Sequence, residues 1–101
     1  MPVIENAHTV QLLEGQATDT SSEGYTFATG NDKYVMVSGG FGSGTVNIEL
    51  YAATTDDWVP IDGGEFTAPA ARLMLSIPKS ATIRATLSGA TAATINVEIT
   101  K

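Results

Sequence analysis

Apolar and polar residues alternate with a period of two along much of this chain. In residues 45–51, Val46, Ile48 and Leu50 are apolar and the residues between them are mostly polar. This period is typical of a β-strand with one buried face and one solvent-facing face. The alternation is most regular in residues 94–100, which predict a second strand of the same kind.

The rest of the chain divides into short segments of this type, separated by Gly, Pro, Asp and Asn residues. No segment repeats its apolar residues with a helical period. The predicted strands are residues 9–14, 25–27, 34–38, 45–51, 58–61, 65–67, 71–77, 82–87 and 94–100. Such short strands at intervals of about 8–12 residues predict an all-β fold. We expect a single antiparallel β-sandwich or jelly-roll-like domain of about seven to nine short strands over residues 9–101, preceded by an extended N-terminal arm, residues 1–8.

Several local features refine this expectation. The Gly-rich run 39–44 predicts a flexible hairpin loop. Trp58 lies just past the hairpin that begins with residues 45–51, and we expect it to close one end of the core. Pro60 has no N–H to donate, so its strand is predicted to be an edge strand or a very short one, and residues 62–64 predict a tight turn.

The strand predicted at 71–77 has two chemically different faces. Leu73, Leu75 and Ile77 are in phase, so they are expected to point inward. Arg72 and Met74 share the opposite, outer face. The outer faces of the predicted strands are polar but carry few charges, and only 16% of the chain is charged. Exposed surfaces usually carry roughly 25–35% charged residues, so the composition favours surface that is covered in an assembly.

The charge balance excludes some partners. The chain has 11 acidic and 5 scattered basic residues, a net charge of −6. Binding to nucleic acid depends on basic groups that neutralise phosphates, so no nucleic acid partner is expected. Neither an anionic membrane surface nor a membrane span is expected. Cysteine is absent, which excludes a disulfide scaffold and favours assembly in a reducing cytoplasm, and residues 1–5 do not resemble a signal peptide.

No motif predicts an enzyme. The Gly-rich run lacks the Gly-Lys-Ser/Thr of a P-loop, and the aspartates of residues 56–62 lack the spacing of an EF-hand. The only histidine, His8, has no nucleophile motif near it. We therefore expect no catalytic residue, no metal and no cofactor. Trp58 with Tyr34 and Tyr51 leaves two alternatives open, an aromatic platform for sugars or packing against the core.

Two phrases of the sequence resemble small virion proteins of tailed bacteriophages. Residues 44–51 (GTVNIELY) match a G-T-V strand with alternating apolar residues, and residues 57–61 (DWVPI) match its hairpin partner. The later strands, up to about residue 100, follow the same order. The resemblance implies a non-enzymatic virion structural protein, most simply a capsid decoration (cement) protein on the head surface, assembled in the host cytoplasm.

The resemblance also implies partners. The expected ones are the major capsid protein or other virion proteins, and other copies of this chain in a trimer or dimer. We select candidate interface residues from the arm, the Gly-rich loop and the aspartate loop: Val3, Ile4, His8, Phe41, Asp57 and Trp58. The alternative function is a carbohydrate- or receptor-binding β-sandwich module of a tail or fibre.

Overall fold

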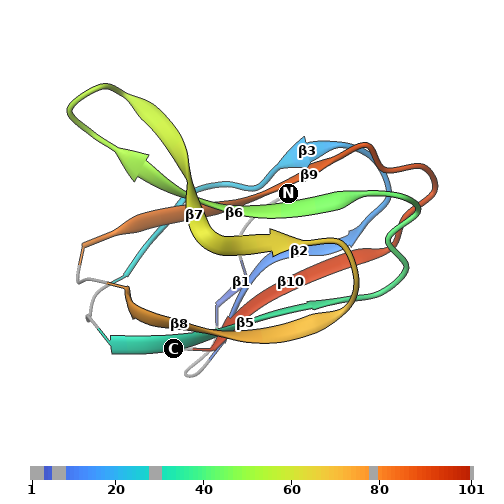
Figure 1. Ribbon diagram of the computed structural model, residues 1–101, viewed down its shortest axis with the longest axis horizontal. Coiled ribbons are helices and arrows are strands. Elements are labelled where there is room, and N and C mark those ends of the chain that lie inside the picture. The colour runs from blue at the N-terminus through green and yellow to red at the C-terminus, as the bar shows by residue number, and fades with distance from the viewer. Residues whose placement is uncertain (1–3, 6–8, 28–30, 78–79, 101) are drawn as a thin grey trace.

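The computed structural model describes residues 4–5, 9–27, 31–77 and 80–100. In this part of the chain the fold is all-β, with two antiparallel sheets stacked on each other (Figure 1). The first sheet has the order β1 (Ile4–Glu5), β2 (Thr9–Gln16), β10 (Ile95–Thr100), β5 (Asn31–Ser38), β8 (Ala70–Ile77). In the second sheet, β3 (Thr20–Ser21) and β4 (Tyr25–Thr26) both pair with β9 (Thr82–Ser88), followed by β6 (Thr45–Ala52) and β7 (Asp57–Phe66).

The predicted fold class is confirmed. Among the described residues, seven strands have six residues or more, and three, β1, β3 and β4, have two residues each. Part of the predicted N-terminal arm belongs to the first sheet, because Ile4 pairs with Gln11 and Glu5 pairs with Val10 of the same chain. The rest of the arm, residues 1–3 and 6–8, lies outside the described residues.

The core forms between the two sheets, where the inward side chains of the long strands meet. Ile95, Val97 and Ile99 are fully buried, as their alternation predicts. Each such side chain contributes about 1.5–3 kcal/mol when it leaves water. The buried hydrophobic residues that the described strands of the second sheet contribute are Val46, Ile48, Phe66, Ile83, Ala85 and Leu87. Their register places Ile48 opposite Ala85 and Leu50 opposite Ile83, so one face of β6 and β9 points into the core.

The Gly-rich run 39–44 connects the two sheets, so its prediction as a flexible hairpin loop was wrong. It leaves β5 in the first sheet and enters β6 in the second. The loop is anchored to the turn before β10, because the amide of Thr94 donates to the carbonyl of Gly40 at 2.8 Å. Gly39 has a positive φ of 97°, and a Cβ at this position would overlap the carbonyl of Thr94. Phe41 is half-buried and packs against the core.

Strand β7 is a single element, although the sequence predicts two pieces separated by a turn. Between the pairs Asn47–Glu65 and Glu49–Pro60, β6 has only Ile48, whereas β7 has residues 61–64. The predicted turn is therefore a large bulge that bends the strand, and Gly63 there has a φ of 79°. The edge position predicted from Pro60 is confirmed, because β7 ends the order of the second sheet.

Arg72 is exposed, but it lies on the face of β8 that points toward the second sheet, not on the outer face that the sequence predicts. Its register partner is the fully buried Val35. The guanidinium donates to the carbonyls of Gly63 at 2.7 Å and Glu65 at 2.5 Å. It also lies 4.3 Å from the centre of the Phe66 ring. Arg72 thus covers backbone acceptors of the edge strand β7 and links the two sheets at this side.

Candidate functional site

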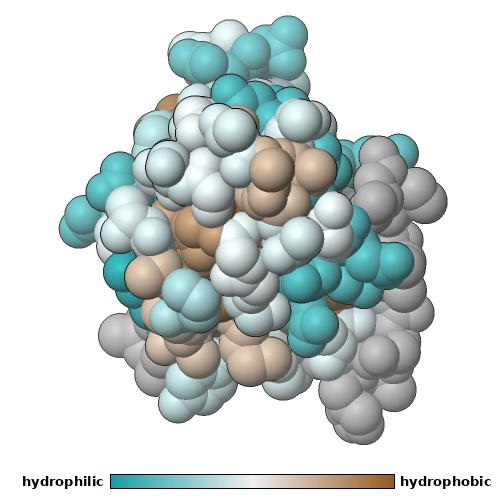
Figure 2. All heavy atoms as spheres, turned by 90° about the vertical axis from the view of Figure 1, so that its right-hand side faces the viewer, coloured by the Kyte–Doolittle hydropathy of each residue, from teal (hydrophilic) through white to brown (hydrophobic). Residues whose placement is uncertain are grey.

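The end of the β6–β7 hairpin protrudes from the fold. It rises away from the first sheet (upper left in Figure 1). The turn between Ala52 and Asp57, which pair with each other, consists of exposed polar residues. Figure 2 shows this end as a protrusion with mainly hydrophilic atoms at the top of the molecule.

The core side of this hairpin end carries two exposed apolar residues. Leu50 is in phase with the buried Val46 and Ile48, and it pairs with Val59 on β7. Leu50 is nevertheless 36% exposed and Val59 is 49% exposed. The prediction that Leu50 belongs to the core was therefore wrong, because the hairpin leaves the opposite sheet before this row of residues is covered. Two apolar side chains on a protruding element are a candidate contact surface.

Trp58 lies on the other side of the hairpin, on the outer face of the second sheet. It pairs with Tyr51, whose ring centre is 5.1 Å away. Its ring also lies 4.4 Å from the guanidinium carbon of Arg84, and its far edge reaches Gly24. The side chain thus spans from β7 across β6 to β9. The expectation that Trp58 closes the end of the core was wrong, since its position along β7 is out of phase with the core side.

An ion pair fixes the surface beside the Trp58 ring. Nε of Arg84 donates to Oε1 of Glu49 at 2.7 Å, and the hydroxyl of Thr86 donates to the same oxygen at 2.8 Å. The side chains of Arg84 and Glu49 are only 25% and 15% exposed although they point out of the sheet. Shielding by the neighbouring ring strengthens such a pair relative to an open one. The two charges of the pair neutralise each other.

The tip of the hairpin contains a second fixed contact. The hydroxyl of Tyr51 donates to Oδ1 of Asp56 at 2.6 Å. This hydrogen bond, together with desolvation and the charge of Asp56, raises the pKa of Tyr51 above its ordinary value of 10.0. Asp57 is exposed, and its carboxylate accepts the backbone N–H of Trp58 at 3.0 Å.

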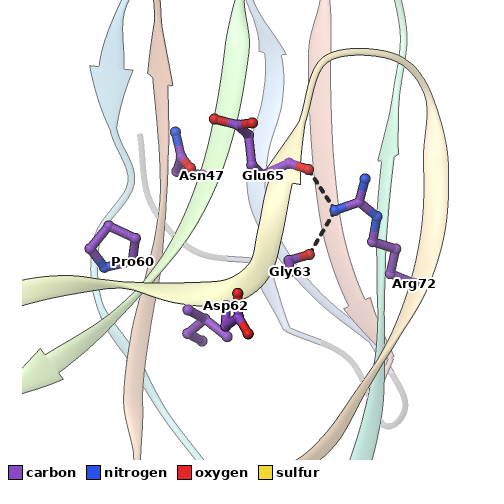
Figure 3. Close-up of a pocket in the computed structure, with 7 residues that line it drawn as sticks. Asn47, Pro60, Asp62, Gly63, Glu65 and Arg72 are labelled. Carbon is purple, nitrogen blue, oxygen red and sulfur yellow. Dashed lines mark hydrogen bonds between the residues drawn. The ribbon is translucent and has the colours of Figure 1, made fainter.

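A hollow of about 600 Å³ lies beside the bulge of β7 (Figure 3). Its walls are Asn47 from β6, residues 60–63 and Glu65 from β7, and Arg72 from β8. Arg72 is held by the two backbone carbonyls described above. Among the described residues, no side-chain hydrogen bond or ion pair is formed by Asn47, Asp62 or Glu65. The hollow therefore offers an amide and two carboxylates that are free to bind.

The structure brings together only two of the predicted interface residues, Asp57 and Trp58, both on the hairpin. Phe41 packs against the core instead of standing at a loop tip. Val3 and His8 lie outside the described residues, as does the side chain of Ile4. The residues that sequence reasoning missed are Asn47, Glu49, Leu50, Val59 and Arg84, whereas Tyr51 was already a candidate for an aromatic platform. Their alternation identifies the face of the strand that each occupies, but only the bend of the hairpin exposes Leu50 and Val59.

The described residues also bear on metal binding, on membrane insertion and on the exposed apolar side chains of the first sheet. They contain no group of three or more His, Asp or Glu side chains that could hold a metal ion. They also contain no helix that could cross a membrane. The outer face of the first sheet exposes Tyr34 and Met36, on the side of the fold away from the hairpin's sheet.

Comparison of the chain with protein-family models, with curated proteins and with solved structures gives no match. The functional inference therefore depends on the geometry of the hairpin and on the chemistry of its residues.

Proposed function

We propose that this protein is a non-enzymatic structural protein of a tailed-bacteriophage virion, a capsid decoration protein that binds the head through the end of its β6–β7 hairpin. One observation carries the proposal. Leu50 and Val59 form an apolar pair on the core side of a protruding hairpin, where their own fold does not cover them. A shell protein that covers this pair would complete the burial that the fold begins.

The energetics support a contact at this position. Removing the remaining exposed surface of two aliphatic side chains from water contributes on the order of 1 kcal/mol or more for each. Asp56 and Asp57 at the adjacent turn are exposed. A basic rim around an apolar groove on the major capsid protein would complement both features and would speed association.

Repeated contacts between an oligomer of this chain and the shell would compensate for the small size of each contact. A contact of this size gives weak binding in a single copy. A dimer or trimer that contacts the shell at several points has a higher overall affinity through avidity. The low charge of the chain, 16% of its residues, fits a protein whose surface is covered by neighbours. The resemblance of residues 44–61 to small phage virion proteins points to the same class.

Co-sedimentation tests the proposal. Heads of the encoding phage, prepared without this protein, are mixed with increasing amounts of the purified chain, and the bound protein is measured in the pellet. We expect saturation at a fixed ratio to the capsid protein. Val59→Asp places an uncompensated charge in the apolar contact, so we expect at least tenfold weaker binding.

Tyr34→Ser on the outer face of the first sheet is the matched control, because it also removes an exposed large side chain but leaves the hairpin intact. Circular dichroism of each variant confirms that the fold is retained. Wild-type binding by Val59→Asp, or no binding of the wild-type chain to the heads, contradicts the proposal.

A further inference from the structure

Part of the Trp58 ring remains accessible beside its neighbours. The Arg84 guanidinium lies against the ring at 4.4 Å, and Tyr51 is inclined to it at 52°. Trp58 is half-buried, so part of its ring surface remains accessible to a ligand. Arg84 is in turn fixed by Glu49. The ring is therefore a rigid aromatic surface on the outside of the sheet, held in place before any ligand binds.

The hollow beside the bulge lies on the same side of the hairpin. Pro60 lines the hollow and shares the outer face of β7 with Trp58, two positions before it. Asn47, also in its wall, shares the outer face of β6 with Glu49. Two residues along a strand correspond to about 7 Å, so the aromatic surface and the polar hollow are neighbours.

The free groups of the hollow are suited to hydroxyl ligands. The carboxylates of Asp62 and Glu65 accept hydrogen bonds, and the amide of Asn47 both donates and accepts. None of these three groups is used by another described side chain. A site with an aromatic face and a few polar groups beside it is the usual composition of a small-ligand site.

From this arrangement we infer that the outer face of the β6–β7 hairpin binds a neutral saccharide chain. One sugar ring packs its C–H groups against the accessible part of the Trp58 ring, because an aromatic ring carries negative potential on its faces. The next sugar places its hydroxyls in the hollow, against Asn47, Asp62 and Glu65. This inference goes beyond head binding and does not depend on it, because it uses the opposite side of the hairpin.

The charges of the site favour a neutral ligand over an acidic one. Arg84 is neutralised by Glu49. Of the described residues that line the hollow, only Arg72 is a cation, and it already donates to two backbone carbonyls. The two free carboxylates and the net charge of −6 repel an anionic glycan.

The single tryptophan of the chain makes a direct test possible. The fluorescence of Trp58 in the isolated protein is titrated with linear neutral hexasaccharides of glucose in β-1,4 and α-1,4 linkage, of xylose, mannose and N-acetylglucosamine. An oligogalacturonate of the same length serves as the acidic comparison. We expect a saturable change in intensity or wavelength with at least one neutral chain and none with the acidic one.

Isothermal titration calorimetry then measures the affinity of each variant for the neutral chain that gives the largest fluorescence change. Trp58→Ala and Asn47→Ala are each expected to weaken binding at least fivefold, because they remove the stacking surface and the amide. Trp58→Phe keeps a smaller aromatic ring and is expected to bind with intermediate affinity. Tyr34→Ala on the first sheet is the matched control and is expected to bind like the wild type.

Three results would overturn the inference: no response to any neutral chain at millimolar concentration, equal affinity of Trp58→Ala and the wild type, or binding of the acidic chain alone. Because no phage head is present in this experiment, its outcome is separate from that of the co-sedimentation test.

Discussion

At the residue scale, the two-fold alternation identifies which side chains share a strand face, but it does not identify what lies against them. Lys33 is an example, since it is in phase with Val35 and Val37 and is only 1% exposed. Its ammonium lies 4.5 Å from the centre of the Phe27 ring. A lysine at the start of a strand is expected to be exposed, and only the tertiary structure places it inside.

The hydrogen bond between Tyr51 and Asp56 predicts a measurable titration. It raises the pKa of Tyr51 above 10.0, because the bond requires the protonated hydroxyl and an ionised Tyr51 would face a carboxylate. Spectrophotometric titration near 295 nm should show one tyrosine that ionises late, and Asp56→Asn should lower its pKa toward 10.0. An unchanged titration in Asp56→Asn would refute the contact.

The same bond has a defined effect on stability. Below pH 10 Tyr51 is protonated in both the folded and the unfolded chain, so the stabilisation is fully present. As the pH rises above 10, the unfolded state loses its proton first, and the stabilisation is lost as the pH passes through the raised folded-state pKa. Urea denaturation at pH 9 and at pH 11 measures the free energy of unfolding in the two conditions. Asp56→Asn is the control, and its free energy of unfolding should fall less between the two pH values.

At the element scale, β6 is a strand whose buried face is covered along only part of its length. Ile48 is fully buried opposite Ala85, whereas Leu50, two residues later on the same face, is exposed. The bulge of β7 at residues 61–64 lies opposite Ile48, so the hairpin changes direction between the covered and the uncovered part. The bulge is thus the feature that directs the hairpin end away from the opposite sheet.

This difference predicts unequal costs for two similar substitutions. Ile48→Ala should lower the free energy of unfolding by about 2–5 kcal/mol, because it leaves a cavity in the core. Leu50→Ala should lower it by less than about 1 kcal/mol, because water already reaches that side chain. Chemical denaturation with urea measures both, and equal losses would mean that the hairpin is folded back onto the core in solution.

At the scale of the whole molecule, strands distant in the sequence form the sheets. Strand β10, near one end of the sequence, lies between β2 and β5 in the first sheet, and β8 pairs with β5 rather than with its sequence neighbour β7. Pairing of this kind requires the closure of long loops, so we expect folding in milliseconds to seconds.

The central position of β10 predicts that the fold requires this strand. A chain that ends after Ala93 should not fold, because β2 and β5 lose the strand that joins them.

The turn of the β6–β7 hairpin should be dispensable by comparison. Replacement of residues 53–56 by Asn-Gly should preserve the fold, because this turn is exposed and outside the core. Circular dichroism and amide NMR spectra distinguish the folded from the unfolded chain, and a folded chain without β10 would show that this sheet order is wrong.

By itself, the sequence determined the class of fold and most strand positions, because the period of two and the turn residues act locally. The buried residues of β10 and the edge position of Pro60 follow from the same local rules. Only the tertiary structure decided that residues 39–44 cross between the sheets, that residues 61–64 form a bulge, and that Arg72 reaches across to β7. The tertiary structure also decided which residues lie together on the hairpin. Trp58, Arg84 and Glu49 come from three strands, and the adjacency of these strands depends on non-local pairing. The exposure of Leu50 depends on where the opposite sheet ends.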